Sequence, residues 1–273
     1  MGDLDVDTQV EGSNGGYRAR LSEEWEIWGP CGGYVAAIAL RAAAAEATLD
    51  RPASFACQYL APGAFDAVDL EVVRIGATKR SESIRVSMTQ RGRPILESLV
   101  RFTETSNGLR HDATSPPDVP DPGTLKTWEE IGFRPPYPFW NNLEACAIDW
   151  HDDWLKRPPG DPVYRQWYRF RPTPIFDDPI LDAARLLIVL DIGPWPAATA
   201  ASTGRMEFIA PSLDLAVRFH RSAPDSDWLF GDAIAPIAED GLVSGSARVW
   251  SRDGRLLASG EQHMLCRPNP AEG

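Results

Sequence analysis

The order of predicted secondary structure repeats along the chain, and this duplication restricts the possible folds more than any other sequence feature. Each half has one long helical segment followed by strand-like segments. Two stretches of the first half have counterparts in the second: Leu60-Ala61-Pro62 with Ile209-Ala210-Pro211, and the hairpin from Arg91 to Ser98 with the hairpin from Asp253 to Ser259. Similar hairpins can arise by chance. Here both the order and the anchor residues recur, which favours two copies of one structural unit.

The first half contains an alanine-rich helix and a set of strands. The segment from Gly32 to Ala47 has no proline and follows Gly29-Pro30, which predicts a helix entered through glycine. Its small side chains allow other backbones to approach closely. Alternating apolar and polar residues then predict three strands, at Val68–Ile75, Ser83–Gln90 and Ile95–Phe102.

A change of composition separates the two halves. From Thr103 to about Thr124, four prolines stand among Asp, Ser and Gly, which is typical of an exposed linker. We therefore expect an N-terminal unit over residues 1–105, a proline-rich linker over 106–125 and a C-terminal unit over 126–273.

The second half repeats the pattern of one helix among strands. Asp178 suits the N-cap of a helix and Pro179 its first turn, so we expect a helix from Asp178 to Asp191 that the glycine and prolines of residues 193–196 end. The segments with strand character are Ala145–Trp150, Val163–Phe170, Gly204–Ala210, Leu213–His220, Leu242–Trp250 and Leu256–Leu265.

A long helix followed by a meander of strands has few ways to bury its apolar face. A curved antiparallel sheet wrapped around the helix is one of them, and it belongs to the α+β class. We expect two such units to pair so that their strands form one continuous sheet. The chain has 273 residues, 43% of them hydrophobic, which is enough for a sizeable core.

Charge and residue spacing exclude several classes of function. A net charge of -12 argues against a nucleic-acid binder. The four cysteines and four histidines are scattered, so the sequence predicts no metal site, no disulfide framework and no cofactor. The acidic N-terminus does not resemble a signal peptide, and the longest apolar run, Tyr34–Ala45, is too short to span a bilayer. We expect a cytoplasmic protein.

Short motifs along nearly the whole chain resemble the thioesterase-like superfamily of double-hotdog proteins, related to bacterial acyl-CoA thioesterase II. The more specific ones lie in the second half. The motifs are Gly32-Gly33, Arg74-Ile75-Gly76 with Lys79-Arg80-Ser81, Gln90-Arg91-Gly92-Arg93, Pro211-Ser212-Leu213-Asp214-Leu215 with Arg218-Phe219-His220, Trp228-Leu229, and Asp253 to Ser259 with Gln262.

The resemblance implies a double-hotdog fold and hydrolysis of an acyl-CoA thioester by a polarised water. In the related enzyme a helix Asp, a Thr or Ser and a Gln hold that water. Asp191, Ser212 and Gln262 match these positions, with Ser where the enzyme often has Thr. The implied partner is a small-molecule acyl-CoA, without nucleic acid or membrane. A homo-oligomer is compatible with open sheet edges.

Each of the three residues also has an ordinary structural explanation. Asp191 falls within the apolar stripe of its helix, where a carboxylate is costly unless it is bonded; the alternative is that it caps the following loop. Gln262 shares a strand face with small residues and is suited to hold a water; the alternative is that it faces solvent. Ser212 follows a proline, and the alternative for it is a turn serine that bonds its own backbone. No GxSxG motif supports it as a nucleophile.

Four further residues are candidates for substrate binding. Amides near Gly32 and Gly33, at a helix N-terminus, are suited to polarise the thioester carbonyl. Trp28 is a candidate for lining an acyl pocket, with packing in the core as the alternative. Arg80, in a local basic set, is a candidate for binding CoA phosphates, with a solvated rim as the alternative. Cys31, beside them, has no paired histidine and is expected to be an inert thiol.

Polar candidates gather in the second half only. The counterpart of Ser212 in the first half is Gly63, and that of Gln262 is Val100 or Arg101. We therefore expect one active site per chain. Two alternatives share the fold, because fold does not fix function: a non-catalytic acyl or polyketide binder, and a hotdog hydratase or dehydratase, which would need a histidine that the predicted helices lack.

Overall fold

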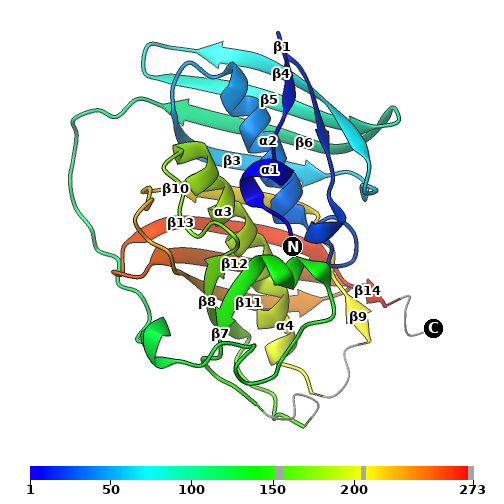
Figure 1. The fold of residues 1–273 in the computed structure, drawn as a ribbon, viewed down its shortest axis with the longest axis vertical. Helices are drawn as coiled ribbons and strands as arrows, with labels where there is room; N and C mark the ends of the chain where they lie inside the picture. The colour runs from blue at the N-terminus through cyan, green and yellow to red at the C-terminus, as the bar shows by residue number, and fades with distance from the viewer. Residues whose placement is uncertain (152–155, 204–206, 270–273) are drawn as a thin grey trace.

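Two long helices lie against one face of a single large antiparallel sheet (Figure 1). The computed structural model describes residues 1–151, 156–203 and 207–269. In this part of the chain the main sheet has 12 strands in the order β1-β2-β4-β5-β6-β3-β10-β13-β12-β11-β8-β7. The first six strands in sequence form one half of the sheet and the later ones the other half. The predicted α+β double hotdog is therefore confirmed.

In each half two strands precede the long helix and the other strands follow it, whereas the sequence analysis predicted no strand before the first helix. The helical segments are α1 (Leu4–Asp7), η1 (Glu23–Trp25), α2 (Gly32–Glu46), η2 (Pro122–Thr124), η3 (Pro138–Asn142), α3 (Pro179–Ile192) and α4 (Pro194–Ala200). The strands of the first half are β1 (Glu11–Ser13), β2 (Gly16–Arg20), β3 (Arg51–Tyr59), β4 (Ala67–Ala77), β5 (Ser81–Gln90) and β6 (Arg93–Thr103). The later strands are β7 (Leu143–Cys146), β8 (Val163–Phe170), β9 (Phe208–Ile209), β10 (Asp214–Phe219), β11 (Leu229–Glu239), β12 (Leu242–Ser251), β13 (Leu256–Leu265) and β14 (Arg267–Pro268).

The two halves of the sheet join where β3 pairs with β10. Ala56 faces Ala216 at this junction. Buried residues flank the pair symmetrically, because Phe55 opposes Val217 and Cys57 opposes Leu215. The pair therefore marks the pseudo-twofold axis that relates the duplicated units.

This axis corrects one of the predicted correspondences between the halves. The residue four positions before Ala216 is Ser212, and the residue four positions before Ala56 is Pro52, so Pro52 and not Gly63 is the counterpart of Ser212. The Leu60-Ala61-Pro62 stretch lies after β3, whereas the Ile209-Ala210-Pro211 stretch lies before the equivalent strand β10. The similarity of these two stretches is accidental, while the β5–β6 and β12–β13 hairpins do correspond.

The alanine content of α2 explains how the sheet and the other helix come so close. Five alanines of this helix are fully buried: Ala36, Ala37, Ala39, Ala42 and Ala43. At its N-terminus, a Cβ atom on Gly33 would lie 2.7 Å from the Cα atom of Ile188 in α3. Glycine at this position is therefore what allows the two helices to pack in direct backbone contact.

The second helix begins as predicted, but it is not amphipathic. The Oδ1 atom of Asp178 accepts a hydrogen bond of 2.7 Å from the amide of Ile180, and Pro179 occupies the first turn. Nearly every residue from 181 to 192 is buried, because α2 covers one side of the helix and the sheet the other. Arg185 and Asp182 are buried together at 2.6 Å, with backbone groups satisfying their remaining hydrogen-bonding atoms.

Two long strands were missing from the sequence prediction. β3 carries Pro52 near its start, and β11 contains Gly231 and Pro236, residues that ordinarily argue against a strand. In β11 the proline stands at a register shift between Ile234 and Ile237, where no ladder bond is lost. The pairing partners on both sides hold these segments as strands, which local propensity does not reveal.

Other predicted segments differ at their ends. The segment Ala145–Trp150 is a strand only as far as Cys146, and the predicted strand Gly204–Ala210 is reduced to Phe208–Ile209, outside the main sheet, while residues 204–206 lie outside the described part. The prolines after α3 do not end the helical path but open the short helix α4.

The connection between the halves is mostly exposed, as predicted, but its far end is docked. Residues 104–121 contain no helix or strand. At its far end, however, Pro122 is buried, and the backbone oxygen of Pro120 accepts a hydrogen bond of 3.0 Å from the indole of Trp167. The connection therefore docks against the second half before the chain enters it.

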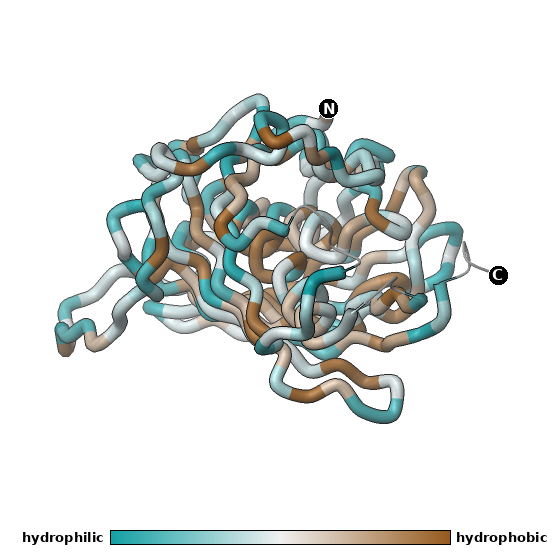
Figure 2. The backbone as a smooth tube through the Cα atoms, turned by 90° about the horizontal axis from the view of Figure 1, so that it is seen from below, coloured by the Kyte–Doolittle hydropathy of each residue, from teal (hydrophilic) through white to brown (hydrophobic). Residues whose placement is uncertain are grey.

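The apolar residues gather between the helices and the sheet. In Figure 2 the hydrophobic segments lie in the interior, and the hydrophilic ones follow the loops and turns around it. Among the described residues, no helix combines the length and apolarity that crossing a bilayer requires.

Candidate active site

Asp191, near the end of α3, has a carboxylate directed at the N-terminus of α2. Its Oδ2 atom accepts a hydrogen bond of 2.7 Å from the amide of Gly33 and lies 3.5 Å from the thiol of Cys31. Its Oδ1 atom accepts a hydrogen bond of 2.8 Å from the hydroxyl of Ser212. The carboxylate thus does not cap the loop after its own helix. It bonds the second amide of the other helix, whose N-cap residue Cys31 makes no side-chain capping bond.

Burial dominates the protonation behaviour of Asp191. The residue is only 8% exposed. Loss of hydration raises the pKa of its carboxyl above the ordinary value of 3.8, although the hydrogen bonds from Ser212, Gly33 and Cys31 oppose the rise. A carboxylate with a raised pKa is a stronger proton acceptor than an exposed one, which is the property that a general base needs.

Ser212 reaches the carboxylate because of the strand geometry around it. The residue forms an isolated bridge with Met264 of β13, and the amide of Leu213 donates to the backbone oxygen of His263 at 2.8 Å. This pairing fixes the segment before β10 next to the end of α3. The hydroxyl of Ser212 therefore donates to a distant side chain and does not merely bond its own turn.

Gln262, on β13, lies on the inner face of the sheet and is 2% exposed. Its Nε2 atom donates a hydrogen bond of 3.0 Å to the backbone oxygen of Asp191. Its Oε1 atom is buried without a hydrogen-bond partner among the described residues. The predicted solvent-facing alternative is wrong. The side chain holds the end of α3 in position and keeps one acceptor atom uncommitted.

A cavity of about 490 Å³ opens beside this cluster. Asp191, Ser212 and Gly32 form part of its wall, and the rest is mainly apolar. Its aromatic residues come from four separate segments: Trp28, Tyr59, Tyr137, Trp140 and Trp195. A concave, mostly apolar volume with a few converging polar groups is typical of a small-molecule site.

The two glycines at the start of α2 have different roles. A Cβ atom on Gly32 would lie about 3 Å from both carboxylate oxygens of Asp191 and from the hydroxyl of Tyr59, so glycine keeps this part of the cavity open. The amide of Gly33 is already bonded to Asp191. It is therefore not free to polarise a substrate carbonyl, contrary to the sequence-based prediction.

The thiol of Cys31 is buried in the same wall. Burial, and then the neighbouring carboxylate of Asp191, raises the pKa of this thiol well above its ordinary value of 9.0. The group therefore stays protonated and acts as a weak donor, as expected of an inert thiol.

The other two predicted binding residues have separate locations. Trp28 lines the cavity, where its Nε1 atom donates a hydrogen bond of 2.9 Å to the hydroxyl of Tyr137 and its ring meets that of Trp195 edge to face. Arg80 does not line the cavity. It lies in the turn between β4 and β5, where it is exposed and its guanidinium pairs with Glu104 at 3.1 Å.

Among the residues of the cavity wall that were not predicted, three bear on its function. Tyr59 ends a strand that the sequence analysis missed, and Trp195 stands between the prolines that appeared to end α3. Arg267, an exposed residue of β14, is the basic side chain at the wall. Neither periodicity nor spacing indicates these positions, because only the crossing of α2, α3 and the strand ends brings them together.

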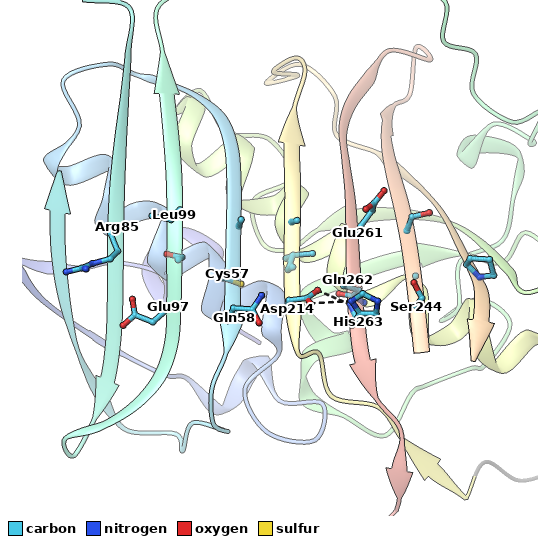
Figure 3. Close-up of a pocket in the computed structure, with 17 residues that line it drawn as sticks. Cys57, Gln58, Arg85, Glu97, Leu99, Asp214, Ser244, Glu261, Gln262 and His263 are labelled. Atoms are coloured by element: carbon cyan, nitrogen blue, oxygen red, sulfur yellow. Dashed lines mark hydrogen bonds and ion pairs between the residues drawn. The ribbon is translucent and has the colours of Figure 1, made fainter. Parts of the chain in front are cut away.

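A larger hollow on the outer face of the sheet is not the site of this chemistry. It crosses the β3–β10 junction, and most of its lining residues are exposed or partly exposed, with Arg85, Glu97 and the pair Asp214–His263 along it (Figure 3). The side chain of Gln262 turns from these strands toward α3, where its amide bonds Asp191. Neither Asp191 nor Ser212 lines this hollow, so it lacks the groups that the chemistry requires.

Two family models and several solved structures match this chain. Models of the N-terminal and C-terminal domains of acyl-CoA thioesterases match residues 21–103 and 112–266. An acyl-CoA thioesterase II from Mycobacterium marinum is 23% identical with a TM-score of 0.79, covering 98% of this chain and 100% of that chain. The tesB protein of Mycobacterium avium subspecies paratuberculosis is 24% identical with a TM-score of 0.79, covering 97% and 98%.

A protein of unknown function with a hot dog fold, from Alicyclobacillus acidocaldarius, is similar to the same extent. It is 20% identical, with a TM-score of 0.82 and coverage of 98% of this chain and 99% of that chain. Identities at this level show the common fold, whereas the two domain models span most of the sequence. The chain therefore belongs to the acyl-CoA thioesterase family of double-hotdog thioester hydrolases.

Proposed function

We propose that this protein hydrolyses an acyl-CoA thioester to the free acid and CoA by attack of a water that Asp191 activates. The observation that carries the proposal is the buried carboxylate in the wall of an apolar cavity. A carboxylate has about four lone-pair positions. The hydrogen bonds from Gly33, Cys31 and Ser212 occupy three of them, with only one on Oδ1. The remaining position on Oδ1 is available to a water.

The proposed reaction uses that water as the nucleophile. Asp191 takes one of its protons while the oxygen forms a bond to the thioester carbon. The carbon–sulfur bond then breaks, and the proton passes from Asp191 to the departing CoA sulfur. Ser212 keeps the carboxylate oriented toward the water, and its own oxygen can accept from the same water.

Gln262 acts in this scheme as a positioning residue. Its amide fixes the backbone of Asp191 at 3.0 Å. Its Oε1 atom lacks a partner among the described residues, and a buried acceptor in this state favours an ordered water nearby.

The cavity and its rim account for the two parts of the substrate. The tryptophans Trp28, Trp140 and Trp195 favour an acyl group in the cavity. Arg267 gives the wall a guanidinium suited to a CoA phosphate. On this basis we propose Arg267, in place of Arg80, as the phosphate-binding residue.

Thiol release from a panel of short-, medium- and long-chain acyl-CoAs tests the proposal. We expect release from at least one chain length. Tight binding of acyl-CoA without release from any of them would contradict hydrolysis and support the non-catalytic binder. Hydration of an enoyl-CoA would support the hydratase, but none of the four histidines lines the cavity.

A further inference from the structure

The cavity contains a buried hydroxyl that the scheme above leaves unused. Tyr59 is the last residue of β3, and its backbone amide donates to the oxygen of Leu213 at 2.9 Å, next to Ser212. The side chain lines the cavity. Its hydroxyl oxygen is buried and makes no hydrogen bond to any residue that the structure describes.

A buried hydroxyl without a partner is costly and requires an explanation. The thiol of Cys57 lies close to Tyr59, but a thiol is a weak hydrogen-bond acceptor. Burial raises the pKa of the Tyr59 hydroxyl well above its ordinary value of 10.0. The group therefore keeps its proton, and with only the weak acceptor Cys57 beside it, it is available to donate to a bound ligand.

The thioester reaction supplies such an acceptor. When water attacks the carbonyl carbon, negative charge develops on the carbonyl oxygen and needs hydrogen-bond donors. The amide of Gly33, at the helix N-terminus, is committed to Asp191. One of the two amides predicted to polarise this oxygen is therefore occupied, and a side-chain donor in the cavity wall would add to its stabilisation.

The position of Tyr59 fits this role. A Cβ atom on Gly32 would lie 3.1 Å from the Tyr59 hydroxyl and 3.0 Å from the Oδ1 atom of Asp191. The absence of a side chain therefore leaves a gap that is bordered by both a proton acceptor and a proton donor. A reacting carbonyl carbon in this gap would have its water beside Asp191 and its oxygen beside Tyr59.

We propose that Tyr59 is a further catalytic residue, whose hydroxyl donates a hydrogen bond to the carbonyl oxygen of the bound thioester and to the oxyanion formed on attack. The proposal rests on the proposed function. In this arrangement the hydrogen-bond donor, Tyr59, comes from the first half of the chain and the base, Asp191, from the second. The attacking water then lies beside Asp191 and the carbonyl oxygen beside Tyr59.

The substitution Tyr59→Phe removes only the hydroxyl. We expect kcat to fall by about 10²-fold, the usual effect of losing one oxyanion donor, with KM changed by less than about threefold. The matched control is Tyr168→Phe. The hydroxyl of Tyr168 is also buried and without a hydrogen-bond partner in the described part of the chain, but it does not line the cavity. This control should keep both constants.

The infrared stretch of the substrate carbonyl gives a second readout that does not depend on turnover. An acyl-CoA labelled with ¹³C at the carbonyl is bound to the Asp191→Asn variant, with and without Tyr59→Phe. A donated hydrogen bond lowers the stretching frequency, so we expect a higher frequency when the hydroxyl is absent.

The two proposals fail in distinguishable ways. No thiol release by the wild-type protein would contradict hydrolysis, while the carbonyl frequency would still test Tyr59. Full kcat in Tyr59→Phe, together with a carbonyl frequency unaffected by the hydroxyl, would overturn the role of Tyr59 and leave the role of Asp191 intact. An equal loss in Tyr168→Phe would show that the effect is structural.

Discussion

The substitution Asp191→Asn should separate the chemistry of the site from the stability of the fold. The two side chains have the same shape, and the Asn oxygen can still accept from the amide of Gly33, which now donates to Oδ2 at 2.7 Å. The change removes the negative charge and the capacity to take a proton from water. Because general-base catalysis contributes about 10²–10⁴-fold, we expect kcat to fall by at least about 10².

The same change should make the protein more stable at neutral pH. The pKa of Asp191 is raised from 3.8 in the folded state, mainly by burial. Below pH 3.8 the folded and unfolded states both hold the proton. Between pH 3.8 and the raised pKa the unfolded chain has lost the proton while the folded protein still holds it, so stability falls over this window and levels off above the raised pKa. Each unit of upward displacement costs the folded wild type about 1.4 kcal/mol at pH 7.

Thermal unfolding and steady-state kinetics, measured from pH 4 to pH 8, test both expectations together. The variant should gain in Tm relative to the wild type as the pH rises, and it should lose the acid limb of the kcat/KM profile. A variant that keeps full kcat would refute Asp191 as the base. A variant that is less stable than the wild type at pH 7 would refute the argument that burial of the charge is costly.

Three further substitutions test other parts of the site. Ser212→Ala removes the donor that lowers the pKa of the catalytic carboxyl, so the acid limb of the pH–rate profile should move to higher pH, whereas Ser212→Thr should leave it in place; an unmoved limb in the alanine variant would contradict this. Gly33→Ala would place a methyl group 2.7 Å from the α3 backbone, so denaturant unfolding should show a loss of about 1–3 kcal/mol, with little change in the control Gly76→Ala, where no heavy atom lies within 4 Å. Arg267→Ala should raise KM for acyl-CoA several-fold at constant kcat, and Arg80→Ala should not; the reverse result would restore the original assignment.

The fold could be predicted because its signals are local and repeated. The alanine-rich helix, the Asp178-Pro179 helix start and the paired hairpins each follow from residue type and spacing. The strand β11 could not be recognised, because Gly231 and Pro236 ordinarily argue against a strand. Pairing with its neighbours β12 and β8 holds it in the sheet. The similarity between Leu60-Ala61-Pro62 and Ile209-Ala210-Pro211 also led to a wrong counterpart for Ser212 in the first half.

The sequence allowed only part of the candidate site to be predicted. The resemblance to a known family singled out Asp191, Ser212 and Gln262, and the structure brings all three together. Their actual partners are set by the crossing of α2 and α3, which no pattern in the sequence describes. The free hydroxyl of Tyr59 and the commitment of the Gly33 amide are consequences of that crossing.

The fold is duplicated, but the cluster of Asp191, Ser212 and Gln262 occurs once. This asymmetry follows from different N-cap residues at the starts of α2 and α3. In α3 the second amide, that of Ile180, is bonded by the helix's own N-cap residue Asp178. In α2 the N-cap is Cys31, which makes no side-chain cap, and the second amide is left for the carboxylate of Asp191. Each helix N-terminus therefore meets one carboxylate, but only in α2 does it come from the opposite unit.

This difference means that neither half can form the site alone. The base and its serine come from the second unit, while the helix N-terminus that receives the carboxylate, and the open gap over Gly32, come from the first. Asp178, by contrast, caps its own helix α3, so its carboxylate does not enter the contact between α2 and α3. The start of α2 has no side-chain cap of its own and therefore binds the carboxylate of Asp191. This places a buried acid with a raised pKa at the boundary of the two units, beside the cavity.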